Sequence, residues 1–149
     1  MKRLFAAVIP ALICASHLHA GQMKVEAVMA KDEDSKPTNT FAADVPKVYA
    51  FFKTQGSEKG DKLRSVWIAE DVGEAAPAGT KIDEATLDAD QDNFHGAFSL
   101  SKPTKGWPVG KYRVDLYAGD ELITSVKFTI TKAGKSDKSE TSEESSSED

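Results

Sequence analysis

Hydrophobic and polar residues alternate along most of the chain between residues 22 and 132, and this period of two is typical of half-buried β-strands. The clearest run follows a turn that contains Pro108 and Gly110. In this run apolar and charged side chains point to opposite sides, with Tyr112, Val114 and Leu116 on one side and Lys111, Arg113 and Asp115 on the other. The stretch therefore predicts a strand with one face in the core.

Similar short runs, separated by turns rich in glycine and proline, predict about seven strands in an all-β sandwich or barrel. In the run over 48–53 both faces are apolar, which favours a central position in a sheet. Phe41 stands alone in a polar loop, so we expect it to fill part of the core. No stretch has a helical period. The expected strands lie at 22–30, 48–53, 63–70, 81–87, 94–101, 111–117 and 122–130.

The last two predicted strands do not match in register if Gly119-Asp120 is a two-residue turn. The inward-pointing Leu116 would then pair with Ile123. The last strand, however, has Val126 on its inward face, so Ile123, three residues earlier, would point outward. One extra residue repairs the register, because a slip of one residue inverts every face. We expect either a three-residue loop or a β-bulge near 124–125, and we favour the bulge.

The first twenty residues have the pattern of a secretory signal peptide, with a cationic start followed by about a dozen mostly apolar residues. This is shorter than the roughly 20 residues that a membrane span needs. Cleavage after Ala20 or after Ser16 is expected. Acylation at Cys14 is a weaker alternative, because a large Ile13 precedes the cysteine where a small residue is needed. A retained signal anchor is a further, weaker alternative.

Residues 133–149 are rich in Ser and Glu and contain no aliphatic or aromatic residue beyond Ala133. Such a segment buries too little apolar surface to offset its chain entropy, so we expect a disordered tail. The predicted organisation is a signal peptide over 1–20, a sandwich over 21–132 and a tail over 133–149.

Charge and cysteine content exclude several classes of function. The formal net charge is −5, which gives no basic surface for nucleic acid or anionic lipid. Cys14 is the only cysteine, so the mature protein is expected to have no disulfide and no thiolate metal site. Removal of the signal peptide also removes any membrane span.

The position of Trp67 on a middle strand, together with Gly110-x-Tyr112-x-Val114 at the start of a late one, resembles immunoglobulin-like and fibronectin type III-like sandwiches. The resemblance extends over residues 41–132. Over this range the chain is similar to small immunoglobulin-like modules of bacterial envelope proteins. It implies an antiparallel sandwich in which Tyr112 donates a hydrogen bond to a nearby backbone group. The resemblance brings no catalytic motif and no cofactor.

Three acidic residues alternate in the turn after the fourth expected strand, namely Asp88, Asp90 and Asp92. Alternating carboxylates can bind Ca²⁺, but an EF-hand loop needs Gly and Glu where this chain has Asn93 and Ser99. We therefore expect a solvated acidic turn, with a weak Ca²⁺ site as the alternative.

Aromatic residues are the candidate recognition residues. Trp107 lies in a turn and Tyr117 on the outward phase, so either could contact a sugar or a protein partner. The alternative is that Trp107 closes the end of the sandwich, while Tyr49 and Phe51 cover its second face.

An enzyme is disfavoured because His95 is the one histidine sure to remain after cleavage and no G-x-S-x-G motif exists. The leading expectation is an exported, non-catalytic module that contacts a protein in the bacterial periplasm or at the cell surface. A carbohydrate-binding module is the alternative.

Overall fold

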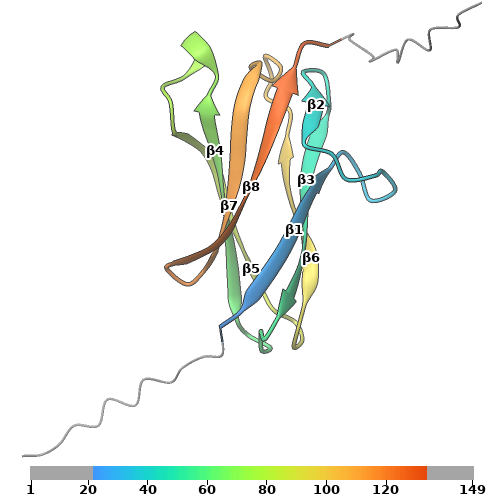
Figure 1. Cartoon of the computed structure of the whole chain (residues 1–149), viewed down its shortest axis with the longest axis vertical. Coiled ribbons are helices and arrows are strands. Elements are labelled where there is room, and N and C mark those ends of the chain that lie inside the picture. The colour runs from blue at the N-terminus through green and yellow to red at the C-terminus, as the bar shows by residue number, and fades with distance from the viewer. Residues whose placement is uncertain (1–21, 134–149) are drawn as a thin grey trace, which may run out of the picture.

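Two facing β-sheets make up residues 22–133, the part of the chain that this computed structural model describes (Figure 1). The strands follow the alternating runs of the sequence closely. A single 3-10 turn, η1 (Gly73–Ala75), interrupts the connection after the fourth strand. The described strands are β1 (Lys24–Ala30), β2 (Thr40–Ala42), β3 (Lys47–Gln55), β4 (Lys62–Asp71), β5 (Thr80–Asp88), β6 (His95–Ser101), β7 (Gly110–Ala118) and β8 (Glu121–Thr131).

The two sheets have unequal numbers of strands. The smaller sheet has the order β1-β3-β6, and the larger sheet has the order β2-β8-β7-β4-β5. β3 is the central strand of the smaller sheet, as its two apolar faces predicted. The predicted all-β sandwich is therefore confirmed.

The short strand β2 was not expected, because its segment reads as a polar loop. Phe41 is buried as predicted, and the residues on either side of it pair in parallel with the end of β8. The sandwich thus has eight strands in the described residues instead of about seven, and one of its pairings is parallel. A three-residue strand carries too few positions for an alternation to be visible.

The predicted β-bulge lies in β8, one residue earlier than expected. Ala118 pairs with Glu121, so Gly119-Asp120 is a two-residue turn. Tyr117 then pairs with Leu122 but Leu116 pairs with Thr124, which leaves Ile123 as the extra residue. The bulge restores the match between the inward faces of β7 and β8, as the mismatch of phases required.

The core lies between the sheets and consists largely of the residues that alternation placed inward. Trp67 is 1% exposed, and its ring meets that of Phe128 edge-to-face at 6.0 Å. Phe52, at the centre of the smaller sheet, packs against both Phe94 and Phe98 at 5.3 Å. Aromatic side chains supply much of the buried area that holds the two sheets together.

The unequal sheets leave β5 uncovered. β1 packs beside β8, so the three strands of the smaller sheet can cover β8, β7 and β4 but not β5. Eight of the nine residues of β5 are exposed, and the ninth is half-buried. One flank of the sandwich is therefore a single layer thick.

Some predictions concern residues that lie outside the described range. They are the signal peptide over 1–20, its cleavage and lipidation alternatives, and the disordered tail, of which only Ala133 is described. No helix within residues 22–133 is long and apolar enough to cross a membrane.

Candidate interaction surfaces

The turn before β7 is built around Gly110 and Tyr112. Gly110 has a φ of +154°, and a Cβ there would collide with the carbonyl oxygen of Asp71 and lie 2.9 Å from the Cα of Val72. The Tyr112 hydroxyl donates to the Pro108 carbonyl oxygen at 2.5 Å, as the resemblance implied. Burial raises the pKa of Tyr112 to about 12. This region is a structural corner.

Trp107 is buried, which favours its packing interpretation over its recognition interpretation. Its side chain is 4% exposed, and its ring meets the Tyr112 ring edge-to-face at 5.9 Å. Its Nε1 donates to the Val45 carbonyl oxygen at 2.9 Å. The indole therefore closes the end of the sandwich at which β7 begins, because its N–H donates to the backbone of the connection before β3.

Tyr117 lies on the outer face of the larger sheet, but its ring is not a free platform. The Arg64 guanidinium lies over it, 4.4 Å from the ring centre, and the same guanidinium approaches Glu84 at 3.7 Å. Such a cation–π contact occupies a ring face that a sugar would need. Tyr117 is half-buried, so only part of it remains available to a partner.

Tyr49 and Phe51 cover the outer face of the smaller sheet, as the packing alternative predicted. Their rings stack at 5.5 Å with 15° between their planes, and both are half-buried. The Lys47 ammonium lies 5.8 Å from the Tyr49 ring centre. This pair is the most accessible stack of aromatic rings in residues 22–133.

Asp88 ends β5, and Asp90 and Asp92 lie in the turn that follows it. No group of three or more metal-ligating side chains comes together within residues 22–133. Asp88 binds the Lys62 ammonium at 2.6 Å, and Asp92 accepts a hydrogen bond from the Lys59 backbone N–H at 2.8 Å. The engagement of Asp88 by Lys62 and of Asp92 by the Lys59 backbone favours the solvated-turn interpretation over the Ca²⁺ alternative.

Asp115 is a buried charge that alternation alone placed on the solvent side. It is 4% exposed and accepts hydrogen bonds from Ser125 Oγ at 2.6 Å and from Arg113 Nε at 3.2 Å. Desolvation lowers the pKa of Arg113, but hydrogen bonds to Asp115 and Glu70 outweigh it, so that pKa lies above its ordinary value. This group stabilises the outer face of the larger sheet, and its two carboxylates, Asp115 and Glu70, are both engaged by Arg113.

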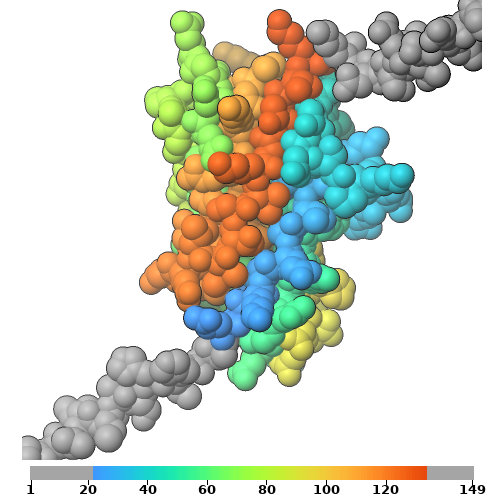
Figure 2. All heavy atoms as spheres, in the orientation of Figure 1, coloured from blue at the N-terminus to red at the C-terminus, as the bar shows by residue number. Residues whose placement is uncertain are grey.

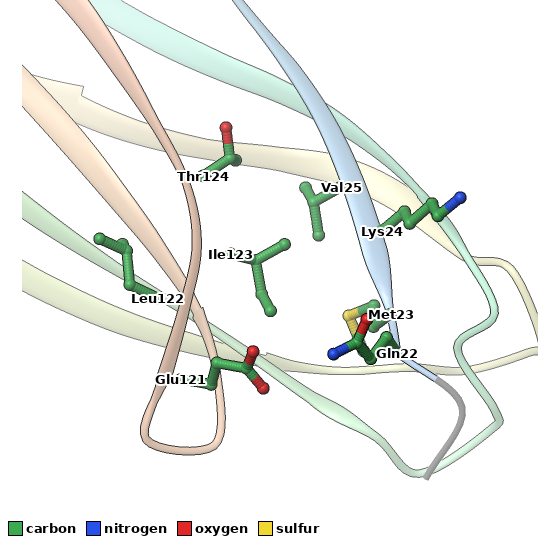
Figure 3. A pocket seen from close by; sticks show the side chains of 8 residues that line it. All are labelled: Gln22, Met23, Lys24, Val25, Glu121, Leu122, Ile123 and Thr124. Carbon is green, nitrogen blue, oxygen red and sulfur yellow. The ribbon is translucent and has the colours of Figure 1, made fainter. Parts of the chain in front are cut away.

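A shallow pocket of about 330 Å³ lies at the lower end of the sandwich, between the start of β1 and the β7–β8 hairpin (Figure 3). The side chains of Val25 and Ile123 lie between the two strands, while Lys24 and Glu121 lie at the margins. In the space-filling view the two segments meet at this end of the molecule (Figure 2). The pocket is open to solvent and gathers no set of catalytic groups.

The free edge of β6 carries unpaired backbone groups. At one end of the β3–β6 pairing, Thr54 N–H donates a hydrogen bond to the Phe94 carbonyl oxygen, and at the other end Lys102 N–H donates to the Pro46 carbonyl oxygen. In an antiparallel pair every second residue bonds to the neighbouring strand, so the even-numbered residues of β6 bond to β3. The backbone N–H and C=O groups of every second residue must therefore point away from β3. These residues are His95, Ala97, Ser99 and Ser101, and none has another backbone partner among residues 22–133.

Beside this edge, the inner face of β5 exposes apolar side chains. Leu87 lies opposite the core residue Leu63 and so shares its face, yet Leu87 is 37% exposed. Ile82, at a bulge of β5, is 38% exposed. Ile82 also lines an almost wholly apolar crevice of about 120 Å³, whose other walls include Trp107 and Pro103.

Comparison with known proteins adds likeness of shape only. No protein-family model matches the chain, and no curated protein matches it in sequence. An immunoglobulin-like protein from Pseudomonas aeruginosa is 16% identical with a TM-score of 0.49, over 76% of this chain and 99% of that one.

Two larger proteins match over part of their length. An alkylpurine DNA glycosylase from Pseudomonas fluorescens is 13% identical with a TM-score of 0.46, over 72% of this chain and 30% of that one. A β-glucosidase from Erythrobacter marinus is 10% identical with a TM-score of 0.47, and the match covers 74% of this chain and 15% of that one. The two facing sheets, the buried Trp67 and the Tyr112 corner identify the chain itself as an immunoglobulin-like β-sandwich.

Proposed function

We propose that this chain is an exported, non-catalytic immunoglobulin-like module that acts by contact with another protein in the bacterial cell envelope. The observation that carries the proposal is the open edge of β6 beside the uncovered inner face of β5. Unpaired strand edges are a recurring docking surface, because main-chain hydrogen bonds supply affinity and side-chain pockets supply specificity. Export follows from the signal-like pattern of residues 1–20.

The residue inventory supports a binding role. His95 is exposed on β6, and no metal-ligating group of three or more side chains comes together with it in the described part of the chain. Asp115 is engaged by Ser125 and Arg113 instead of facing a cavity. The arrangement therefore offers surfaces for recognition, whereas the general acid and base of a hydrolase would need to converge on one site.

A carbohydrate-binding module is the second candidate. The stacked rings of Tyr49 and Phe51 favour it, since half-exposed aromatic faces suit sugar rings. Trp107 no longer contributes to this candidate, because it is buried. One ring face of Tyr117 is taken by Arg64.

A pull-down from envelope extract combined with a glycan array separates the two candidates. The protein-contact proposal expects a protein partner that stays bound when Tyr49 and Phe51 are both replaced by Ser. Binding on the glycan array that the double substitution abolishes, with no protein recovered, would instead establish the carbohydrate role. A thermal melt of the double variant checks that the sandwich still folds.

A further inference from the structure

We infer that the free edge of β6 takes up an extended segment of a partner protein, which adds to the smaller sheet as a fourth strand and covers the inner face of β5. This inference rests on the proposed protein-contact function and names the surface and the chemistry of the partner. The partner segment spans about seven residues, the length of β6, and alternates apolar and polar side chains.

The backbone of β6 already has the pattern that an added strand needs. His95, Ala97, Ser99 and Ser101 present their N–H and C=O groups at the free edge, spaced two residues apart. β6 pairs with β3 over its full length without a register shift, so this row is straight. An antiparallel segment opposite these four residues would satisfy all of their backbone groups.

The other sheet edges are protected, and β6 is not. β1 is partly covered, since its Met29 carbonyl oxygen accepts a hydrogen bond from Thr38 N–H. β5 contains a bulge at Ile82 and carries four charged side chains, while β2 is only three residues long. The sequence of β6, His-Gly-Ala-Phe-Ser-Leu-Ser, has no Lys, Asp, Glu or Pro. Charge, bulges and short length are the usual means of keeping a strand edge from pairing.

The inner face of β5 provides the floor on which such a strand would rest. Ala85 and Leu87 share the inner face with the core residues opposite them, but the three-stranded sheet does not reach them. A strand beside β6 occupies the missing fourth position, above these side chains. At the upper end, the crevice between Ile82 and Trp107 is wide enough for one apolar side chain.

The charges at the two ends of β6 favour one direction of the partner strand. Lys102 and Lys105 are exposed beyond its end, and neither lies within 4.0 Å of an acidic side chain of residues 22–133. Asp90, in the turn before its start, is also exposed. An antiparallel segment that begins with an acidic residue and ends with a basic one complements both ends.

A single segment fits this site better than a second copy of the chain. If two copies paired edge to edge through β6, the β5 of each copy would extend beneath the β6 of the other copy. That position is already filled by the β4 of the other copy, so the two larger sheets would overlap. A single strand brings no second layer, so it fills the position without meeting β5 from below.

Amide hydrogen exchange by NMR tests the inference with a synthetic peptide, Glu-Val-Thr-Val-Thr-Val-Lys, blocked at both ends. Its valines are placed opposite Gly96, Phe98 and Leu100, so that they face β5. The peptide should slow exchange at the amides of His95, Ala97, Ser99 and Ser101 severalfold. A peptide of the same composition without alternation, Glu-Val-Val-Thr-Thr-Val-Lys, is the control.

Leu87→Lys should weaken the alternating peptide about tenfold, because it removes the apolar floor. Leu122→Lys is the matched change, since Leu122 is also exposed but lies on β8 beside the β7–β8 turn. Thermal melts of both variants confirm folding. Unchanged exchange at the four edge amides, or equal effects of the two lysine variants, would overturn the inference. So would a concentration-dependent dimer that protects β6 without peptide.

Photo-crosslinking separates failure of the inference from failure of the proposed function. A crosslinker at Ser99 should capture the envelope partner, and a crosslinker at Leu122 should not. A partner captured from other surfaces but never from Ser99 would contradict the β6 site while leaving protein contact in place. A module that captures no protein from any surface contradicts both.

Discussion

The Tyr112 hydroxyl donates a hydrogen bond to the carbonyl oxygen of Pro108, four residues earlier in the chain, at 2.5 Å. The bond joins the turn that contains Trp107 to the first residues of β7. It holds the crossover from the smaller to the larger sheet at the upper end of the sandwich. Several consequences of this corner can be measured.

Tyr112→Phe should lower the free energy of unfolding by about 1–2 kcal/mol, because it leaves the Pro108 carbonyl oxygen without its donor. Urea denaturation measures the change. Tyr49→Phe is the matched control, since Tyr49 is half-buried on the outer face and should lose only a few tenths of that amount. Equal losses in the two variants would show that the corner bond contributes nothing.

The same tyrosine should make stability fall at high pH. Its pKa is about 12 in the folded protein, above the value of about 10 in an unfolded chain. The unfolded state therefore releases the proton first, so the stabilisation is complete below pH 10 and is lost as the pH rises toward 12. Thermal melts between pH 9 and 12 should show a smaller decline for Tyr112→Phe than for the natural protein. Parallel declines would contradict the assignment.

Trp107→Ala should lower the free energy of unfolding by about 3–5 kcal/mol, because it leaves a cavity between Tyr112 and the connection before β3. Trp107→Phe keeps a ring and should cost less, losing mainly the bond to Val45. Calorimetric melting measures both. A folded Trp107→Ala protein of near-natural stability that no longer binds its partner would restore the recognition role.

Gly110→Ala should destabilise the protein by about 3 kcal/mol, because its Cβ meets the backbone of Asp71 and Val72. Gly119→Ala is the comparison, since Gly119 also has a positive φ but no atom within 4 Å of the new Cβ. It should cost about 1 kcal/mol. Denaturant midpoints measure both, and a similar cost at the two positions would mean that the contact with Asp71 relaxes easily.

Calcium should not stabilise the protein. Asp88 and Asp92 are engaged by Lys62 and by the backbone of Lys59, so the three carboxylates of the turn do not face one ion. A few millimolar Ca²⁺ should therefore leave the melting temperature unchanged and give no heat in calorimetric titration. A rise in melting temperature that Asp90→Asn abolishes would restore the site.

Alternation predicted the strands well because it is a local property of the chain. Tyr112, Val114 and Leu116 are all buried, as the period of two required. The bulge in β8 was also visible, because two strands joined by a two-residue turn must agree in phase. Its position differed by one residue, since several neighbouring sites repair the phase equally well.

Alternation failed to predict the burial of side chains that are covered by residues from other parts of the fold. Asp115 has the outward phase, yet Ser125 and Arg113 enclose it. Trp107 lies in a turn, yet the connection before β3, more than 60 positions earlier, supplies its hydrogen-bond partner. Neither contact leaves a periodic signal near the residue itself.

The sequence by itself therefore determined seven of the eight described strands, most of their inward residues, the tyrosine corner and the need for a bulge. Only the tertiary structure decided which strands pair, that β2 joins β8 in parallel, and that three strands face five. Strand order depends on contacts between segments far apart in the chain, so no local pattern contains it. The open edge of β6 is a consequence of that order, which is why it could be recognised only after the sheets were seen together.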